Sequence, residues 1–129
     1  MVRHSDADQV AIIAAGITLH ESIRAYEQLK SEGIRVRVID AYSVKPIDKA
    51  ALHQAAQVTG GRLVVVEDHW AEGGIGDAVL DAFVGVMEKI PTVVKLAVRS
   101  IPTSGTPAEL LRAAGIDAEH IAQAVRERL

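Results

Sequence analysis

Four short runs rich in apolar or β-branched residues divide this chain, and none of them is long enough to be a membrane span or a long helix. They occupy residues 10–15, 34–41, 63–66 and 93–98. The first and third runs are continuously apolar, a pattern typical of strands that are covered on both faces in a parallel sheet. Because parallel neighbours need crossover connections, the segments between the runs must pack on the sheet. The sequence therefore predicts an α/β domain with three layers, α/β/α.

The segment after the first run carries the signals of an amphipathic helix. Thr18 and Glu21 have the spacing of a capping box, which predicts a helix start. Gly33 predicts the helix end, because glycine readily adopts the left-handed conformation that closes a helix. A helix is therefore expected here, with an apolar stripe at Leu19, Ile23, Tyr26 and Leu29.

Two further helices are predicted in the middle of the chain. Asp48, which follows a Lys-Pro-Ile turn, is expected to cap a short Ala-rich helix that ends near residue 58. Beyond the third apolar run, an apolar stripe at Val79, Phe83 and Val86 predicts a helix that begins at residue 75 and ends before Pro91.

The C-terminal part of the chain predicts two more helices. The stretch 106–109, Thr-Pro-Ala-Glu, combines an N-cap, a proline at the first helical position and a capping box, and Gly115 marks the end of that helix. Asp117 is expected to cap a last helix, which would pack through Ile121 and Val125.

Length and composition favour a single ordinary domain over residues 1–129. Hydrophobic residues make up 49% of the chain and charged residues 24%, as in soluble globular proteins. The net charge of −3 arises without a basic patch, so nucleic acid is not an expected partner. A membrane is not expected either, because no apolar stretch is long enough to span one. The absence of cysteine excludes disulfides and thiolate metal sites, and is compatible with a cytoplasmic location.

The glycine cluster Gly73, Gly74 and Gly76 is the most conspicuous motif. Placed between a strand and a helix, it could hold a phosphate on backbone amides. Carboxylates surround it, however, and would repel an anion. We therefore favour the interpretation that these glycines permit close contact with a neighbouring domain or chain. The surrounding carboxylates are Glu67, Asp68, Glu72 and Asp77.

The third apolar run ends in Glu67, Asp68, His69 and Trp70. Carboxylates and an imidazole at the end of a strand could serve as an acid/base site. No partner with catalytic spacing accompanies them, so a polar strand end with Trp70 buried at an interface is the favoured interpretation. The histidines form no metal-ligand pattern; they are His4, His20, His53, His69 and His120.

The segment after the fourth run offers a second candidate surface. Arg99 could face an anionic substrate, and the hydroxyls of residues 100–105 could assist it. Loops of this composition are more often simple turns, which is the interpretation we favour.

Several motifs, taken together and in order, resemble the C-terminal domain of transketolases. Related domains occur in pyruvate dehydrogenase beta subunits and deoxyxylulose-phosphate synthases, but the complete set is similar to the animal-type transketolase pattern. The motifs are the stretches at residues 18–21, 45–48, 66–69, 72–79 and 104–111, the last reading Ser-Gly-Thr-Pro-Ala-Glu-Leu-Leu.

The resemblance implies a mixed five-stranded sheet, mostly parallel, with one antiparallel edge strand at residues 1–5. It also implies that the complete enzyme is a homodimer that transfers a two-carbon ketol group between phosphorylated ketoses and aldoses. That enzyme would use thiamine diphosphate and a divalent metal, Mg or Ca. In the family, other domains hold this cofactor, and the metal motif Gly-Asp-Gly fails here because Ala78 follows Gly76 and Asp77.

No catalytic, cofactor-binding or metal-binding residue is therefore assigned to this chain. The expected role is packing against the remaining transketolase domains or subunit and shaping the dimer. The alternative is a regulatory module that binds a nucleotide or sugar phosphate near Asp68 and Arg99. The candidate contact residues are His69, Trp70, Glu72, Gly73, Gly74, Arg99, Ser104 and Gly105.

Overall fold

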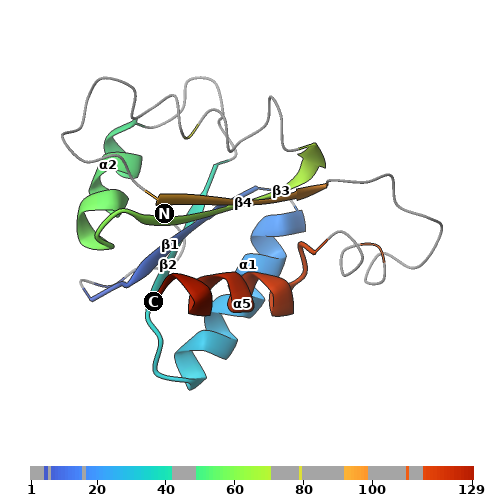
Figure 1. Ribbon diagram of the computed structural model, residues 1–129, viewed down its shortest axis with the longest axis horizontal. Helices are drawn as coiled ribbons and strands as arrows, with labels where there is room; N and C mark the ends of the chain where they lie inside the picture. The colour runs from blue at the N-terminus through green and yellow to red at the C-terminus, as the bar shows by residue number, and fades with distance from the viewer. Residues whose placement is uncertain are drawn as a thin grey trace.

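The computed structural model describes residues 5, 7–15, 17–41, 49–70, 79, 92–98, 110 and 115–129. Within them, four strands form one sheet in the order β2-β1-β3-β4, and every neighbouring pair is parallel (Figure 1). The four predicted strands are therefore confirmed. They are β1 (Val10–Ala14), β2 (Val36–Asp40), β3 (Arg62–Trp70) and β4 (Thr92–Val98).

Two expectations about the sheet have different outcomes. Strand β3 continues to Trp70, although only residues 63–66 were predicted as strand. The antiparallel fifth strand remains a prediction, because residues 1–4 lie outside the described part and Ser5 is not assigned to a strand.

Helices cover both faces of the sheet, as the alternation of elements predicts. Helices α1 (Ile17–Ser31) and α5 (Ala118–Arg128) lie together against one face, and α2 (Lys49–Val58) lies against the other (Figure 1). The described residues thus form three layers. The helices predicted at 75–90 and 106–115 fall largely outside the described residues, although Val79 is described and fully buried.

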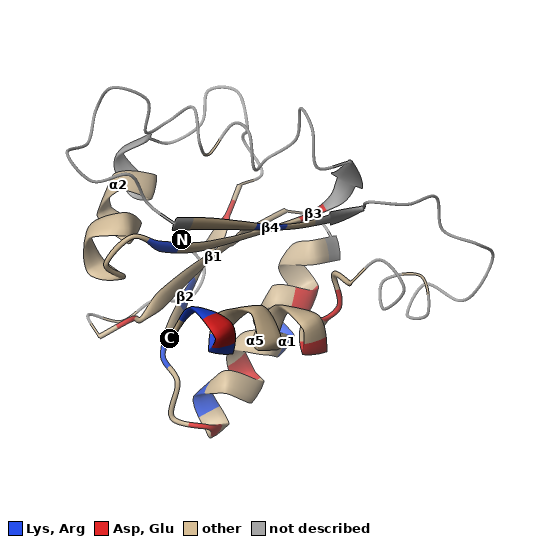
Figure 2. Ribbon diagram, viewed as in Figure 1, with Lys and Arg blue, Asp and Glu red and all other residues tan. Residues whose placement is uncertain are grey.

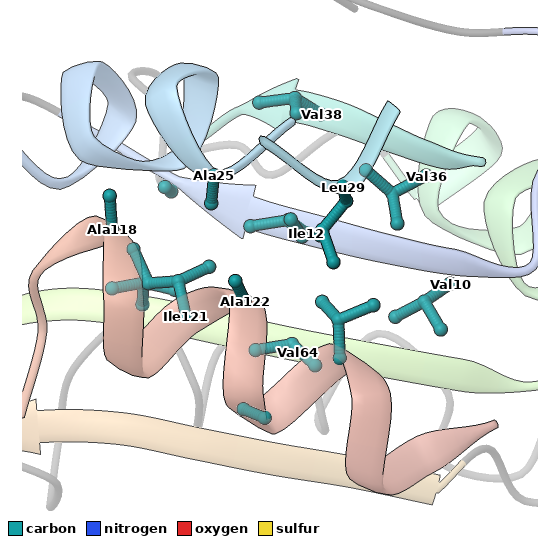
Figure 3. Close-up of a cluster of buried hydrophobic side chains, with 14 of the residues drawn as sticks. Val10, Ile12, Ala25, Leu29, Val36, Val38, Val64, Ala118, Ile121 and Ala122 are labelled. Atoms are coloured by element: carbon teal, nitrogen blue, oxygen red, sulfur yellow. The ribbon is translucent and has the colours of Figure 1, made fainter. Parts of the chain in front are cut away.

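The core is divided by the sheet, because successive residues of a strand point to opposite faces. Val10, Ile12 and Ala14 of β1 pack in the cluster beneath α1 and α5 (Figure 3). Ala11 and Ile13 pack in the second cluster, against α2. All five residues of β1 are 0% exposed, which explains the continuously apolar run in the sequence.

The stop signal at Gly33 is confirmed. Gly33 has φ +79°, and its N–H donates to Lys30 O at 3.1 Å, while the N–H of Ile34 donates to Leu29 O at 2.9 Å. These two bonds form a Schellman motif, which satisfies carbonyls at the end of α1. The predicted cap of α5 is also confirmed, since the N–H of His120 donates to Asp117 Oδ1 at 3.1 Å.

The predicted capping box at Thr18 and Glu21 is wrong. Helix α1 begins at Ile17, and the hydroxyl of Thr18 bonds to Ala15 and to Val66 of β3. Glu21 Oε1 accepts the N–H of Ala118 at 3.3 Å and so caps α5 instead of its own helix. Both side chains have the local spacing of a cap, but tertiary partners occupy their oxygens.

Shortening Ile121 tests the packing of α5. Ile121 is fully buried between α1 and the sheet (Figure 3), so Ile121→Ala should lower the free energy of unfolding by about 2–5 kcal/mol. Urea unfolding followed by circular dichroism measures the loss. Gln123→Ala, on the exposed side of the same helix, is the control and should change little. An Ile121→Ala variant as stable as the control would contradict this packing.

Candidate functional site

The order of the strands creates a switch point at one edge of the sheet. The chain passes from β1 to β2 on one side, and β3 then pairs on the other side of β1. In open α/β sheets, ligands bind outside the carboxyl ends of strands at such a point. The described residues at this edge are therefore the first place to look for chemistry.

Thr18 occupies this switch point with its hydroxyl already engaged. The side chain is fully buried, and Oγ1 lies 2.6 Å from Ala15 O and 3.0 Å from Val66 O. It also accepts the N–H of Ala15 at 3.2 Å. This hydroxyl fastens the start of α1 to the end of β3, so it is not free to act as a nucleophile.

Glu67 follows Val66 on β3 and is 1% exposed. Next to it the pairing with β4 becomes irregular: β3 advances four residues from Val66 to Trp70, whereas β4 advances two from Leu96 to Val98. Two extra residues on one strand make a bulge, a feature that redirects a strand. The burial of Glu67 was not predicted, because the run of valines ends one residue earlier in the sequence.

The structure places the predicted contact residues only in part. His69 and Trp70 form the end of β3, where Trp70 pairs with Val98 of β4. The described parts of β3 and β4 thus end beside each other, at the points where the two predicted contact segments follow in the sequence. The remaining candidates fall outside the described residues: Glu72, Gly73, Gly74, Arg99, Ser104 and Gly105.

A buried ion pair lies near the opposite, amino edge. Arg37 Nε donates to Asp8 Oδ2 at 3.1 Å, with side chains only 4% and 1% exposed. Ser5 completes the network: its N–H and hydroxyl donate to Asp8 at 2.7 and 2.6 Å, and its carbonyl accepts from Arg37 Nη2 at 3.0 Å. This pair was not predicted from the sequence. The signal was an arginine inside the apolar run of β2.

A hollow of about 470 Å³ also lies near the amino edge of the sheet. The regulatory ligand was expected elsewhere, at the carboxyl ends of the strands near Asp68 and Arg99. The ammonium group of Lys30 sits 5.9 Å from the centre of the Tyr26 ring at this hollow, a cation–π geometry. The residues that line it are Ser5, Asp8, Tyr26, Lys30, Gly33, Ile34, Arg35 and Val36.

Charged residues of both signs occur on α1 and α5, which lie side by side (Figure 2). Arg126 bonds Glu32 through two nitrogens, Nε to Oε1 at 2.9 Å and Nη2 to Oε2 at 2.7 Å. These hydrogen bonds hold the pKa of the Glu32 carboxyl below its usual range and raise the pKa of Arg126. Both side chains are about one-third exposed, so solvent screens the pair and its effect on stability is small.

Among the described residues, no three His, Asp or Glu side chains come together as a metal-binding group. The described helices also include none with the length and apolarity needed to cross a membrane.

Breaking the buried pair should be costly, and removing both charges should not. Arg37→Met leaves the Asp8 carboxylate buried without its cation and should lower the free energy of unfolding by about 3–5 kcal/mol. Asp8→Leu combined with Arg37→Met should recover most of this loss. Denaturant titration of the three proteins, with the exposed Arg24→Met as control, measures both effects. Equal stability of Arg37→Met and Arg24→Met would contradict the pair.

The surface pair should show a defined pH dependence. Since the folded pKa of Glu32 is lowered, its stabilisation is present above the ordinary glutamate pKa of about 4.3 and is lost as pH falls through the lower folded value. Arg126→Ala should therefore lower the stability slightly at pH 7. It should have no effect at a pH below the folded pKa of Glu32, where this carboxyl is protonated. Thermal unfolding at both pH values measures this; the same difference at both would count against the pair.

Comparison with known proteins gives a consistent assignment. The family model described as "Transketolase, C-terminal domain" matches residues 1–121. Human transketolase is 52% identical over 126 residues, which cover 98% of this chain and 20% of that protein. Bovine transketolase-like protein 1 is 46% identical over 129 residues, covering 100% of this chain and 21% of that protein. The chain thus spans about a fifth of the length of these relatives.

Solved structures agree with this assignment. A chain described as "Split gene transketolase, inactive beta4 tetramer" matches with a TM-score of 0.84 and 37% identity, covering 95% of this chain and 39% of that one. Transketolase from Campylobacter jejuni matches with a TM-score of 0.68 at 12% identity, over 97% of this chain and 18% of that one, which supports the fold alone. This chain belongs to the transketolase C-terminal domain family.

Proposed function

We propose that this chain is the non-catalytic C-terminal domain of a transketolase and that it supports domain packing and dimer assembly. The observation that carries the proposal is the match over residues 1–121 to a domain that makes up about a fifth of much longer relatives. In the complete enzyme, thiamine diphosphate and a Mg or Ca ion would be held by other domains. Ketol transfer between sugar phosphates, in the cytoplasm, would belong to that whole enzyme.

The polar groups at the switch point support this role. The hydroxyl of Thr18 is shared between two backbone carbonyls, and the carboxylate of Glu21 caps α5. These side chains hold elements together, so the groups that would be placed for catalysis in many α/β enzymes serve the scaffold here.

The contact surface is proposed at the carboxyl ends of β3 and β4. Trp70 and Val98 pair there, and the glycine cluster and Arg99 segment follow them in the chain. A tryptophan beside glycines suits an interface, because the ring buries a large area and glycine allows close backbone approach. The partner would be the remaining transketolase domains, or a second subunit in a homodimer.

A second function is favoured by the hollow near the amino edge. Lys30 and Arg35 line it together with the Tyr26 ring, so a small anion such as a nucleotide or sugar phosphate could bind there. This position differs from the strand ends near Asp68 and Arg99, where a regulatory ligand was expected.

A chimaera tests the proposed function. Replacing the matching C-terminal fifth of human transketolase by this chain should give a dimer that retains ketol transfer, while the isolated chain should show none. Gly73→Trp in the chimaera should weaken docking and shift the protein towards monomer in sedimentation velocity. Ala7→Trp, at an exposed position before β1, is the control. Turnover by the isolated chain, or a Gly73→Trp chimaera with unchanged assembly and activity, would refute the proposal.

A further inference from the structure

The segment before β1 is bonded to β2 through a single arginine side chain. Gln9 still makes a backbone bond to that side of the sheet, since its N–H donates to Arg35 O at 2.8 Å. Before Gln9, the guanidinium of Arg37 makes the connection. Its Nε donates to Asp8 Oδ2 at 3.1 Å, and its Nη2 donates to Ser5 O at 3.0 Å. One side chain of β2 thus holds two points of the segment, and we refer to Ser5, Asp8 and Arg37 as the Arg37 cluster.

The two held points are also bonded to each other. The N–H of Ser5 donates to Asp8 Oδ2 at 2.7 Å, and the hydroxyl of Ser5 donates to Asp8 Oδ1 at 2.6 Å. The side chains of Asp8 and Arg37 are almost fully buried, so solvent screens their attraction little. These bonds fix the path of the backbone from Ser5 to Asp8 relative to β2.

Stability alone does not account for a charged cluster at this place. Nη1 of Arg37 is buried and has no hydrogen-bond acceptor among the described residues, which is unfavourable for a donor. Replacing a buried ion pair by apolar residues of similar volume is often neutral or stabilising. Apolar side chains, however, could neither accept the N–H of Ser5 nor donate to its carbonyl. Beyond stability, the Arg37 cluster therefore supplies a defined position for the backbone at Ser5.

We infer that the Arg37 cluster is the attachment point for the chain that enters this domain from the rest of the complete enzyme, and that it fixes the direction of entry. This inference rests on the proposed function, in which this domain follows the other transketolase domains. The cluster lies near the amino edge of the sheet, whereas the proposed contact surface lies at the carboxyl ends of β3 and β4. The domain would then be held at two opposite edges.

The double variant Asp8→Leu with Arg37→Met separates attachment from stability. It should recover most of the stability that Arg37→Met alone loses, because no charge is left buried without a partner. It also removes the acceptor of the Ser5 N–H and the donor to the Ser5 carbonyl. The Ser5 amide should therefore exchange its hydrogen about 10- to 100-fold faster than in the wild type, as the loss of a bond to a charged acceptor predicts. Solvent-exchange NMR of the folded chain measures this rate.

Two controls accompany this measurement. Gln9 is the internal control, because its N–H bonds a backbone carbonyl that neither substitution removes, and its exchange should stay slow. The matched control variant is Glu32→Gln with Arg126→Met, which removes the ion pair at the surface between α1 and α5. The Ser5 amide of this variant should exchange as in the wild type.

Two results would overturn the inference in the isolated chain. One is an unchanged exchange rate of the Ser5 amide in the folded double variant. The other needs no variant: a Ser5 amide that exchanges in the wild type as fast as an unprotected peptide. The second result decides the matter even if the double variant does not fold.

The chimaera with human transketolase tests the consequence for entry. Hydrogen-exchange mass spectrometry would follow the peptides that span the junction before Ser5. These peptides should exchange faster in the chimaera with Asp8→Leu and Arg37→Met than in the wild-type chimaera, and the matched control should equal the wild type. Equal exchange in all three would overturn the inference. A chimaera that neither assembles nor transfers ketol groups would instead reject the proposed function, while the Ser5 amide of the isolated chain still shows whether the cluster holds the segment.

Discussion

The burial of β1 on both faces is the constraint on which the rest of the structure depends. Each of its five residues is 0% exposed, so α1 and α5 must cover one face of the strand and α2 must cover the other. The parallel pairing of β1 with β2 and β3 on its two sides requires crossover helices, and the two crossovers, α1 and α2, are among the helices that bury it. The burial of β1 in the centre of the sheet thus accounts for both the layers of helices and the order of the strands.

Several buried polar side chains among the described residues hold the elements of this domain in place. Arg37 and Asp8 tie the segment before β1 to β2, Thr18 ties α1 to β3, and Glu21 ties α1 to α5. Each of these side chains is buried and bonded to a group distant in sequence. A domain built in this way gives its neighbours a rigid surface, which agrees with a supporting role in a much longer enzyme.

The sequence predicted the elements better than it predicted the partners of polar side chains. The runs of β1 to β4 could be recognised because burial imposes an apolar pattern, and Gly33 and Asp117 because their roles are local. Thr18 and Glu21 were misassigned since their partners, Val66 and Ala118, are distant in sequence.

The sequence predicts where the candidate site lies in the fold, but not the detailed structure of that site. The structure shows that β3 and β4 end beside each other at Trp70 and Val98, and the two predicted contact segments follow these strand ends in the sequence. The burial of Glu67 and the bulge beside it depend on the register between β3 and β4, and no local pattern records that register.

The most direct test of the supporting role is an amide NMR titration of the purified chain. Thiamine diphosphate with magnesium, pentose phosphates and adenine nucleotides would be added in turn, and the backbone signals followed. A scaffold domain predicts no saturable shift with any of them. Saturable shifts at residues 68–77 or 99–105, or around Lys30 and Arg35, would contradict the account and identify a ligand-binding module instead.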